Sequence, residues 1–387
     1  MAHDCADQGA GHVDEPVLRV RSVPDLLALV PVTLGFEPTE SLVVIAAAGR
    51  YPGFTARVDL PPRGKVANET GPMAEQMTAA VVSQGCTRVA VVVFSRRREP
   101  AETVAAATAD LVERAGVELY DVLRTDGRRY WSMTCRDESC CPPEGTPYDP
   151  WSTPLRAQAA VTGRAVAPDR AALAARFAAP VGDERAAARA AVRRAEDDAI
   201  AELGLRGRRQ LRHLTPRAEK AALPRGAVRV DTLLDALLGP DGTDPHHVAQ
   251  AVTGEHAATL AVWCALLPVR DLAWSRMSRP DAARHLALWT EVSRRVVAPY
   301  EPAVLCLTAF AAWLSGDGAS AWCALDRCER ADRSYSMAGL VAEVLLNCVS
   351  PDEYLPLPRE VMLEACGRPT STATPRHTDA AGRARGG

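Results

Sequence analysis

The chain has 387 residues, of which 47% are hydrophobic and 24% charged, so it can bury a large core and form two domains. Its formal net charge of −3 reflects nearly equal numbers of acidic and basic residues, which argues against a general attraction to nucleic acid or anionic membranes. The N-terminus has neither a basic start nor an apolar run, and no apolar stretch reaches the roughly 20 residues of a membrane helix. We therefore expect a cytoplasmic protein without a membrane segment, whose cysteines stay reduced.

The first 60 residues contain one helical pattern and two strand patterns. Ser22 followed by Pro24 predicts the start of a helix, which should end near residues 31–35, between Pro31 and Gly35. Residues 41–47 form a continuous apolar run of strand length, and residues 54–60 alternate between apolar and polar side chains. The short glycine-containing segment between these strands predicts a hairpin.

Further helices and strands alternate up to residue 134. Apolar residues recur at helical spacing over residues 73–81, and residues 88–94 (RVAVVVF) predict a strand buried on both faces. Residues 101–115 predict another helix. Two more strands are predicted at 117–123 and 128–134, and the Asp-Gly pair between them favours a tight turn. Together these elements indicate an α/β fold, a mixed sheet with packed helices.

Composition divides the chain into five segments. A disordered tail, residues 1–17, precedes the α/β domain, residues 18–180. Residues 181–229 are rich in Ala and Arg; their arginines could face nucleic acid, but the scarcity of aromatic residues favours a solvated helical linker. Helical patterns with short breaks then predict an all-α helical-hairpin domain over residues 230–366. Residues 367–387 form a second predicted disordered tail.

One segment of the helical domain indicates a surface for a protein partner. Residues 309–338 carry small and apolar residues at the spacing of a tetratricopeptide-like helical hairpin, including Gly316 and Ala321. Such hairpins normally occur in arrays that bind other proteins. The sequence therefore predicts one hairpin of this kind.

Several stretches of the chain carry a family resemblance. These are LLALVPVTLGFEPTESLVVIAA, RVDLP, YWSMTC followed by CCPPEGTPYD, VTGRAVAPDRAALAARFA and, in the helical domain, FAAWLSGDGASAWCALDRC. Together they resemble DUF4192, a domain of unknown function in high-GC Gram-positive bacteria. The resemblance implies an α/β part followed by a helical part in a bacterial cytoplasm. It implies no reaction, ligand or catalytic residue.

Three of the 11 cysteines lie in a Cys/Pro-rich loop, residues 135–149, and three interpretations of them stay open. Cys135, Cys140 and Cys141 could bind zinc, although the gap of four residues is longer than that of usual ligand pairs and the spacing indicates no fourth ligand. Cys135 and Cys140 could instead form a transient disulfide. The simplest interpretation is that the thiols pack as small apolar side chains.

A second candidate site follows the predicted buried strand. Ser95 and Arg96 come directly after it, and ligands of layered α/β folds bind at the carboxyl ends of strands. Arginine can pair with a phosphate through two hydrogen bonds. Asp59 and Ser132 would share this rim if their strands were neighbours. We therefore predict a small-ligand site that involves Asp59, Ser95, Arg96 and Ser132.

Common catalytic signatures are missing from the sequence: it contains no HExxH, GxSxG or GxGxxG motif and no EF-hand loop. This favours a non-enzymatic regulatory or scaffold protein that binds a small ligand or a protein partner. The alternative is an enzyme of unrecognised class with a cleft at the strand ends near Ser95, Arg96 and Cys135. A third hypothesis is a zinc- or thiol-dependent sensor that uses the cysteine loop.

Overall fold

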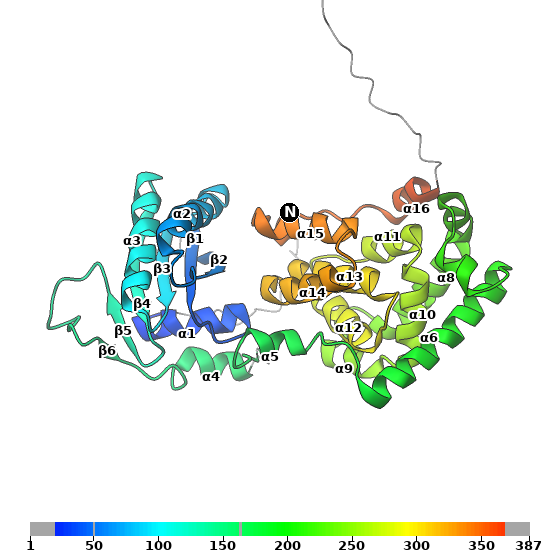
Figure 1. Cartoon of the computed structure of the whole chain (residues 1–387), viewed down its shortest axis with the longest axis horizontal. Helices are drawn as coiled ribbons and strands as arrows, with labels where there is room; N and C mark the ends of the chain where they lie inside the picture. The colour runs from blue at the N-terminus through cyan, green and yellow to red at the C-terminus, as the bar shows by residue number, and fades with distance from the viewer. Residues whose placement is uncertain (1–19, 49–50, 162–164, 368–387) are drawn as a thin grey trace, which may run out of the picture.

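The computed structural model describes residues 20–48, 51–161 and 165–367. Within these residues, a six-stranded mixed sheet lies in the N-terminal half and is followed by helices, as predicted (Figure 1). Of the tails predicted to be disordered, 1–17 and 367–387, residues 1–17 and 368–387 lie outside the described residues. Gly367 belongs to the last helix.

The sheet has the strand order β2-β1-β3-β4-β5-β6. β3 and β4 are parallel, joined by a crossover helix, and the other neighbouring strands are antiparallel. The β1–β2 and β4–β5 hairpins agree with the predicted ones, whereas the short strand β6 was not predicted. The strands are β1 (Ser41–Ala48), β2 (Tyr51–Asp59), β3 (Arg88–Phe94), β4 (Glu118–Thr125), β5 (Arg129–Ser132) and β6 (Thr146–Pro147).

Alternating side chains of the central strands enter two different cores. Leu42, Val44 and Val91 face α2 (Val66–Ser83) and α3 (Arg98–Arg114), which cover one side of the sheet. On the other side, the intervening residues Val43, Ile45 and Val92 join a core that includes α1 (Val23–Leu34). Burial on both faces explains why β1 and β3 are continuous apolar runs.

The first helix begins where the sequence predicts, and it ends at Gly35, the last residue of the predicted range 31–35. The Ser22 hydroxyl accepts a hydrogen bond from the Asp25 amide at 3.3 Å, which caps the N-terminus of α1. Gly35 ends the helix with a left-handed φ of 73°, a conformation that a side chain disfavours. Pro31 lies inside the helix.

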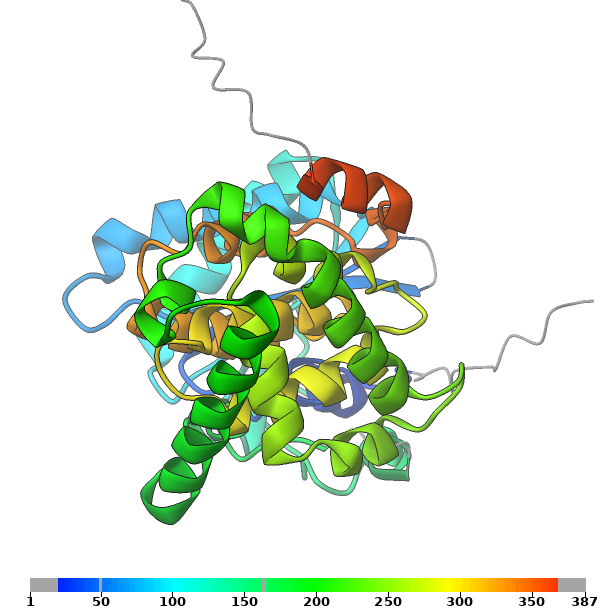
Figure 2. The ribbon, with the colours of Figure 1, turned by 90° about the vertical axis from the view of Figure 1, so that its right-hand side faces the viewer.

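Helices occupy nearly all of the chain after the sheet, and Figure 2 turns this helical part toward the viewer. The core is dense here: Trp289 is fully buried, and α13 packs against both α12 and α14. The helices are α4 (Pro154–Val161), α5 (Arg170–Ala175), α6 (Gly182–Leu203), α7 (Arg208–Arg212), α8 (Pro216–Leu238), α9 (Pro245–Ala251), α10 (Gly254–Cys264), α11 (Leu267–Ser275), α12 (Ala282–Arg295), α13 (Glu301–Leu314), α14 (Gly318–Ala331), α15 (Ser336–Leu346), the 3-10 helix η1 (Pro351–Glu353) and α16 (Arg359–Gly367).

The segment predicted as a helical linker, residues 181–229, packs into the helical core. Ala188, Ala195 and Ala199 of α6 are buried, and α6 lies against α10. Alanine allows two helices to approach closely, so an Ala/Arg-rich composition suits a packed helix with a charged outer face as well as a solvated linker.

The α/β and helical parts share one apolar core and are also joined by polar contacts. Arg170 on α5 forms an ion pair of 2.8 Å with Asp326 on α14. The Gln84 side chain, after α2, donates to the Cys348 carbonyl at 2.6 Å. Among the described helices, none is by itself long and apolar enough to cross a membrane; the pair α10 and α11 meets that length and composition only when taken together, across a bend of 115°.

Candidate functional site

The three cysteines of the Cys/Pro-rich loop converge. The Sγ atoms of Cys135, Cys140 and Cys141 lie within 4.8 Å of one another, in the connection from β5 to β6. Figure 1 places this connection at the end of the molecule remote from the helical part. Cys140 is exposed and the other two are half-buried, so the cluster is accessible from solvent.

A tight turn around Asp137 brings Cys140 and Cys141 back toward Cys135. The amides of Cys140 and Cys141 both donate to the Asp137 carbonyl, at 3.1 and 2.7 Å. The Asp137 carboxylate accepts hydrogen bonds from the hydroxyl and amide of Ser139, which lower the pKa of Asp137. Asp137 therefore holds the loop closed as a charged turn residue.

A second set of hydrogen bonds fixes the start of the loop. Asp121 of β4 accepts from the hydroxyls of Ser132 and Thr134, at 2.8 and 2.7 Å. The Ser132 hydroxyl in turn accepts from the Cys135 amide at 3.1 Å. This chain of contacts connects Cys135 to the sheet, so Ser132, predicted as a ligand-binding residue, here positions a cysteine.

Trp131 anchors the far end of the loop. Its indole donates to the Pro143 carbonyl at 3.0 Å, and the Arg124 guanidinium lies 3.6 Å from the centre of its ring. Gly145 passes so close that a Cβ there would lie 2.4 Å from the indole, and its φ of 84° is left-handed. The Arg129 side chain also donates to the Gly145 carbonyl at 2.6 Å. Only glycine fits this position without displacing the tryptophan.

The cluster has the donor chemistry of a zinc site with an open coordination position. A Zn–S distance near 2.3 Å places tetrahedral thiolates about 3.8 Å apart, so contraction by about 1 Å or less would bring the three sulfurs to that spacing. Partial burial and hydrogen bonds with Cys135 and Cys140 raise the pKa of Cys141 to about 12. A bound cation would offset this by favouring the thiolate. Within the described part of the chain, no fourth His, Cys, Asp or Glu joins the group.

Three of the four residues predicted at the strand ends, Asp59, Ser95 and Arg96, lie at the same edge of the sheet. Ser41 of β1 pairs with Asp59 on one side and with Phe94, which precedes Ser95, on the other. Ser132 lies elsewhere, because β1, β3 and β4 separate β5 from β2. The idea that the strands of Asp59 and Ser132 are neighbours is therefore wrong.

Polar groups at this rim already bind one another. Ser95 is buried, and its hydroxyl lies 3.0 Å from both carboxylate oxygens of Glu40. Arg97 donates to Glu40 at 2.5 Å and to the Pro61 carbonyl at 3.2 Å. Asp59 pairs with Arg57 of its own strand, and Arg96 is exposed. These internal contacts occupy the polar groups at this edge of the sheet. The Ser95 hydroxyl in particular is already hydrogen-bonded to Glu40.

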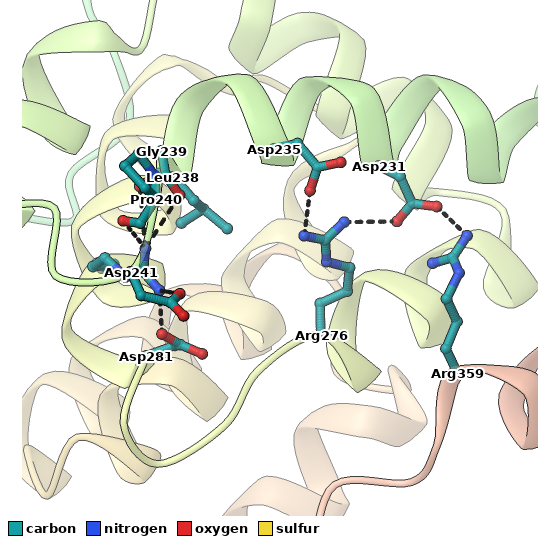
Figure 3. Close-up of polar contacts among 10 residues, drawn as sticks. Asp231, Asp235, Leu238, Gly239, Pro240, Asp241, Arg276, Asp281 and Arg359 are labelled. Carbon is teal, nitrogen blue, oxygen red and sulfur yellow. Dashed lines mark hydrogen bonds and ion pairs between the residues drawn. The ribbon is translucent and has the colours of Figure 1, made fainter. Parts of the chain in front are cut away.

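A hollow of about 520 Å³ lies beside α12, lined by residues that include Asp281 and Arg284. Arg284 extends from α12 to the end of α8, where it donates to the Pro240 carbonyl at 2.7 Å and to Asp241 at 3.0 Å (Figure 3). It also donates to the Leu238 carbonyl at 3.4 Å, so it satisfies a carbonyl at the end of α8.

A neighbouring ion network in the same figure joins three helices. Arg276, after α11, pairs with Asp231 and Asp235 of α8, and Arg359 of α16 also pairs with Asp231 (Figure 3). Its arginines and aspartates neutralise one another, so we assign both this network and the Arg284 contacts to the structure of the helical part.

Sequence reasoning missed the residues that support the cysteine loop. Asp121 is a carboxylate within a predicted strand, and that polar interruption was the available signal. For the close approach of Gly145 to Trp131, the only signal in the sequence is a glycine near two prolines. Their roles depend on contacts between β4, β5 and the loop, which only the folded chain defines.

The family comparison identifies the chain without assigning it an activity. The model of DUF4192, a domain of unknown function, matches residues 24–352. The match covers most of the sequence, so the chain belongs to this family. No curated protein and no solved structure matches it.

Proposed function

We propose that this DUF4192 protein is a regulatory protein that senses zinc through Cys135, Cys140 and Cys141. One observation carries the proposal: three thiols separated by up to six positions in sequence lie within 4.8 Å of one another. The supports of the loop add to it, because Asp121, Ser132 and Trp131 hold the backbone on either side of the thiols. Metal ligands are usually oriented by such surrounding contacts.

An exchangeable site suits this geometry better than a permanent structural one. Structural zinc sites use four protein ligands, whereas three ligands leave a position for water or for a ligand from another molecule. The loop also lies at the surface, and Cys140 is exposed. Zinc could therefore enter and leave without unfolding of either core.

The helical part supplies the proposed docking surface for a protein partner. Support comes from two leucines on α15, Leu340 and Leu346, whose side chains are 57% and 54% exposed. The preceding helices α13 and α14 cover the segment that resembles a tetratricopeptide hairpin. In this proposal zinc binding changes the α/β part while the helical part holds the partner.

Zinc titration of the untagged, fully reduced protein against a competing chelator tests the proposal. We expect one zinc per chain, and loss of this zinc when Cys135, Cys140 and Cys141 are all replaced by serine. Cys348→Ser is the matched control, because Cys348 is half-buried and lies outside the cluster. If the triple variant bound zinc as the natural chain does, the proposal would be wrong.

The same preparation separates zinc binding from redox chemistry. The distances between the three Sγ atoms would also allow a disulfide after a movement of the loop, since a disulfide requires an S–S distance near 2.05 Å. Mass spectrometry after mild oxidation, with and without zinc, distinguishes the two. Protection of the three thiols by zinc supports a metal site, whereas rapid disulfide formation regardless of zinc supports a thiol switch.

A further inference from the structure

The arginine-rich segment after α6 forms a hollow lined by basic residues. Its volume is about 680 Å³, within the range of about 300–1,000 Å³ typical of small-molecule sites, and it opens to solvent. It belongs to the helical part and lies away from the cysteine loop (Figure 1). The lining residues are Arg206, Gly207, Arg208, Arg209, Gln210 and His213.

A fully buried carboxylate fixes one wall of this hollow. Glu196 of α6 has no exposed side-chain surface, and it binds Arg208 at 3.0 Å and Arg212 at 2.6 Å. The Tyr300 hydroxyl also donates to Glu196 at 2.6 Å. Hydrogen bonding to Glu196 raises the pKa of Arg212. Burying a carboxylate costs free energy unless well-placed charged groups compensate it. Arg208 and Arg212 provide that compensation for Glu196, and their ion pairs hold both side chains in position.

The positive charge of the hollow exceeds the negative charge that balances it. Arg208 and Arg212 are neutralised by Glu196 and Asp197. Arg206, Arg209 and His213 are exposed, and within the described part of the chain no hydrogen bond or ion pair occupies their side chains. The hollow therefore presents two arginines and a histidine with unused donors.

We propose that this hollow binds a small phosphate-bearing molecule, a function separate from the proposed zinc site. Guanidinium groups bind phosphate oxygens through paired, charge-assisted hydrogen bonds, and the fixed wall reduces the entropy lost on binding. A small molecule fits better than a nucleic acid, because no Phe, Tyr or Trp side chain lines the hollow to stack with bases.

Calorimetric titration of the full chain with pyrophosphate tests this inference, with sulfate and a single-stranded oligonucleotide as comparison ligands. We expect one pyrophosphate per chain, with binding that weakens as salt rises. Arg206→Ala combined with Arg209→Ala should weaken binding by about tenfold or more, since each arginine offers charge-assisted hydrogen bonds. Arg189→Ala, at an exposed position of α6 outside the hollow, should leave binding unchanged.

Three results would overturn the inference. The first is the absence of pyrophosphate binding to the natural chain at low salt. The second is equal binding by the double variant and the Arg189→Ala control. The third is tighter binding of the oligonucleotide than of pyrophosphate, lost in the double variant, which would make the hollow a nucleic-acid surface. Zinc content is recorded in the same samples, so failure here is distinguishable from failure of the metal site.

Discussion

The cysteine loop and the helical core each bring thiols close together, but in opposite surroundings. Cys306 and Cys328, on α13 and α14, lie 3.6 Å apart and are fully buried. Cys135, Cys140 and Cys141 lie in the connection from β5 to β6, where Cys140 is exposed and the other two are half-buried. The buried pair behaves as small apolar side chains, the interpretation that is simplest for any cysteine. Proximity of thiols therefore indicates a site only where solvent and ions can reach them.

The largest expected difference between the two groups is in alkylation rate. A hydrogen bond with Cys328, together with burial, raises the pKa of Cys306, and reagent can reach it only when α13 and α14 separate. Such opening costs several kcal/mol, so we expect Cys306 to react about a thousandfold or more slowly than Cys140. Peptide mass spectrometry after timed alkylation measures this. Equal alkylation rates for Cys306 and Cys140 would show that reagent reaches the core between α13 and α14.

The next largest difference between the helical core and the cysteine loop is expected in the free energy of unfolding. Trp289 is fully buried beneath α13, so Trp289→Ala should lower the free energy of unfolding by about 3–5 kcal/mol. Without zinc, Cys140→Ser should change it by about 0.5 kcal/mol or less, because Cys140 is exposed. Urea unfolding followed by circular dichroism gives both values. A large loss of stability in Cys140→Ser without metal would contradict this comparison, because it would mean that the loop stabilises the fold as a core residue does.

The supports of the loop are expected to matter for metal affinity. In Gly145→Ala, the new Cβ must displace Trp131 and the loop with it. We expect zinc affinity to fall by about 10- to 100-fold, as it does when groups that orient metal ligands are lost. Gly116→Ala is a control at a positive φ with open space around it, so it imposes backbone strain without a contact near the thiols. Chelator competition measures the zinc affinity of both variants. Equal affinities would show that zinc binding does not require the loop geometry around Gly145.

The smallest expected change is that in zinc affinity across a single pH unit. The pKa of Cys141 is raised to about 12, so this thiol is protonated at neutral pH and must release a proton to bind metal. Affinity should therefore rise with pH, by about tenfold per unit from the Cys141 proton alone. Zinc titrations at pH 6, 7 and 8 measure the slope. An affinity independent of pH would mean that Cys141 does not bind the metal.

The sequence predicted the secondary structure better than it predicted the candidate site. Periodicity defined β1 and β3 because their side chains enter two cores, and the Ser22 cap and Gly35 defined α1. Periodicity does not show the strand order, so a rim shared by Asp59 and Ser132 depended on their strands being neighbours, and three strands separate them. The convergence of the thiols depends on the turn at Asp137 and on contacts with Asp121 and Trp131, which are properties of the folded loop.

X-ray absorption at the zinc edge tests the central claim most directly. For the stoichiometric complex of the full chain, three thiolate ligands predict three sulfur neighbours at about 2.3 Å and one lighter ligand. Replacement of Cys140 by serine should remove one sulfur from that shell or abolish binding. A first shell that contains only oxygen and nitrogen would contradict the account, because the bound zinc would then lie away from the three thiols.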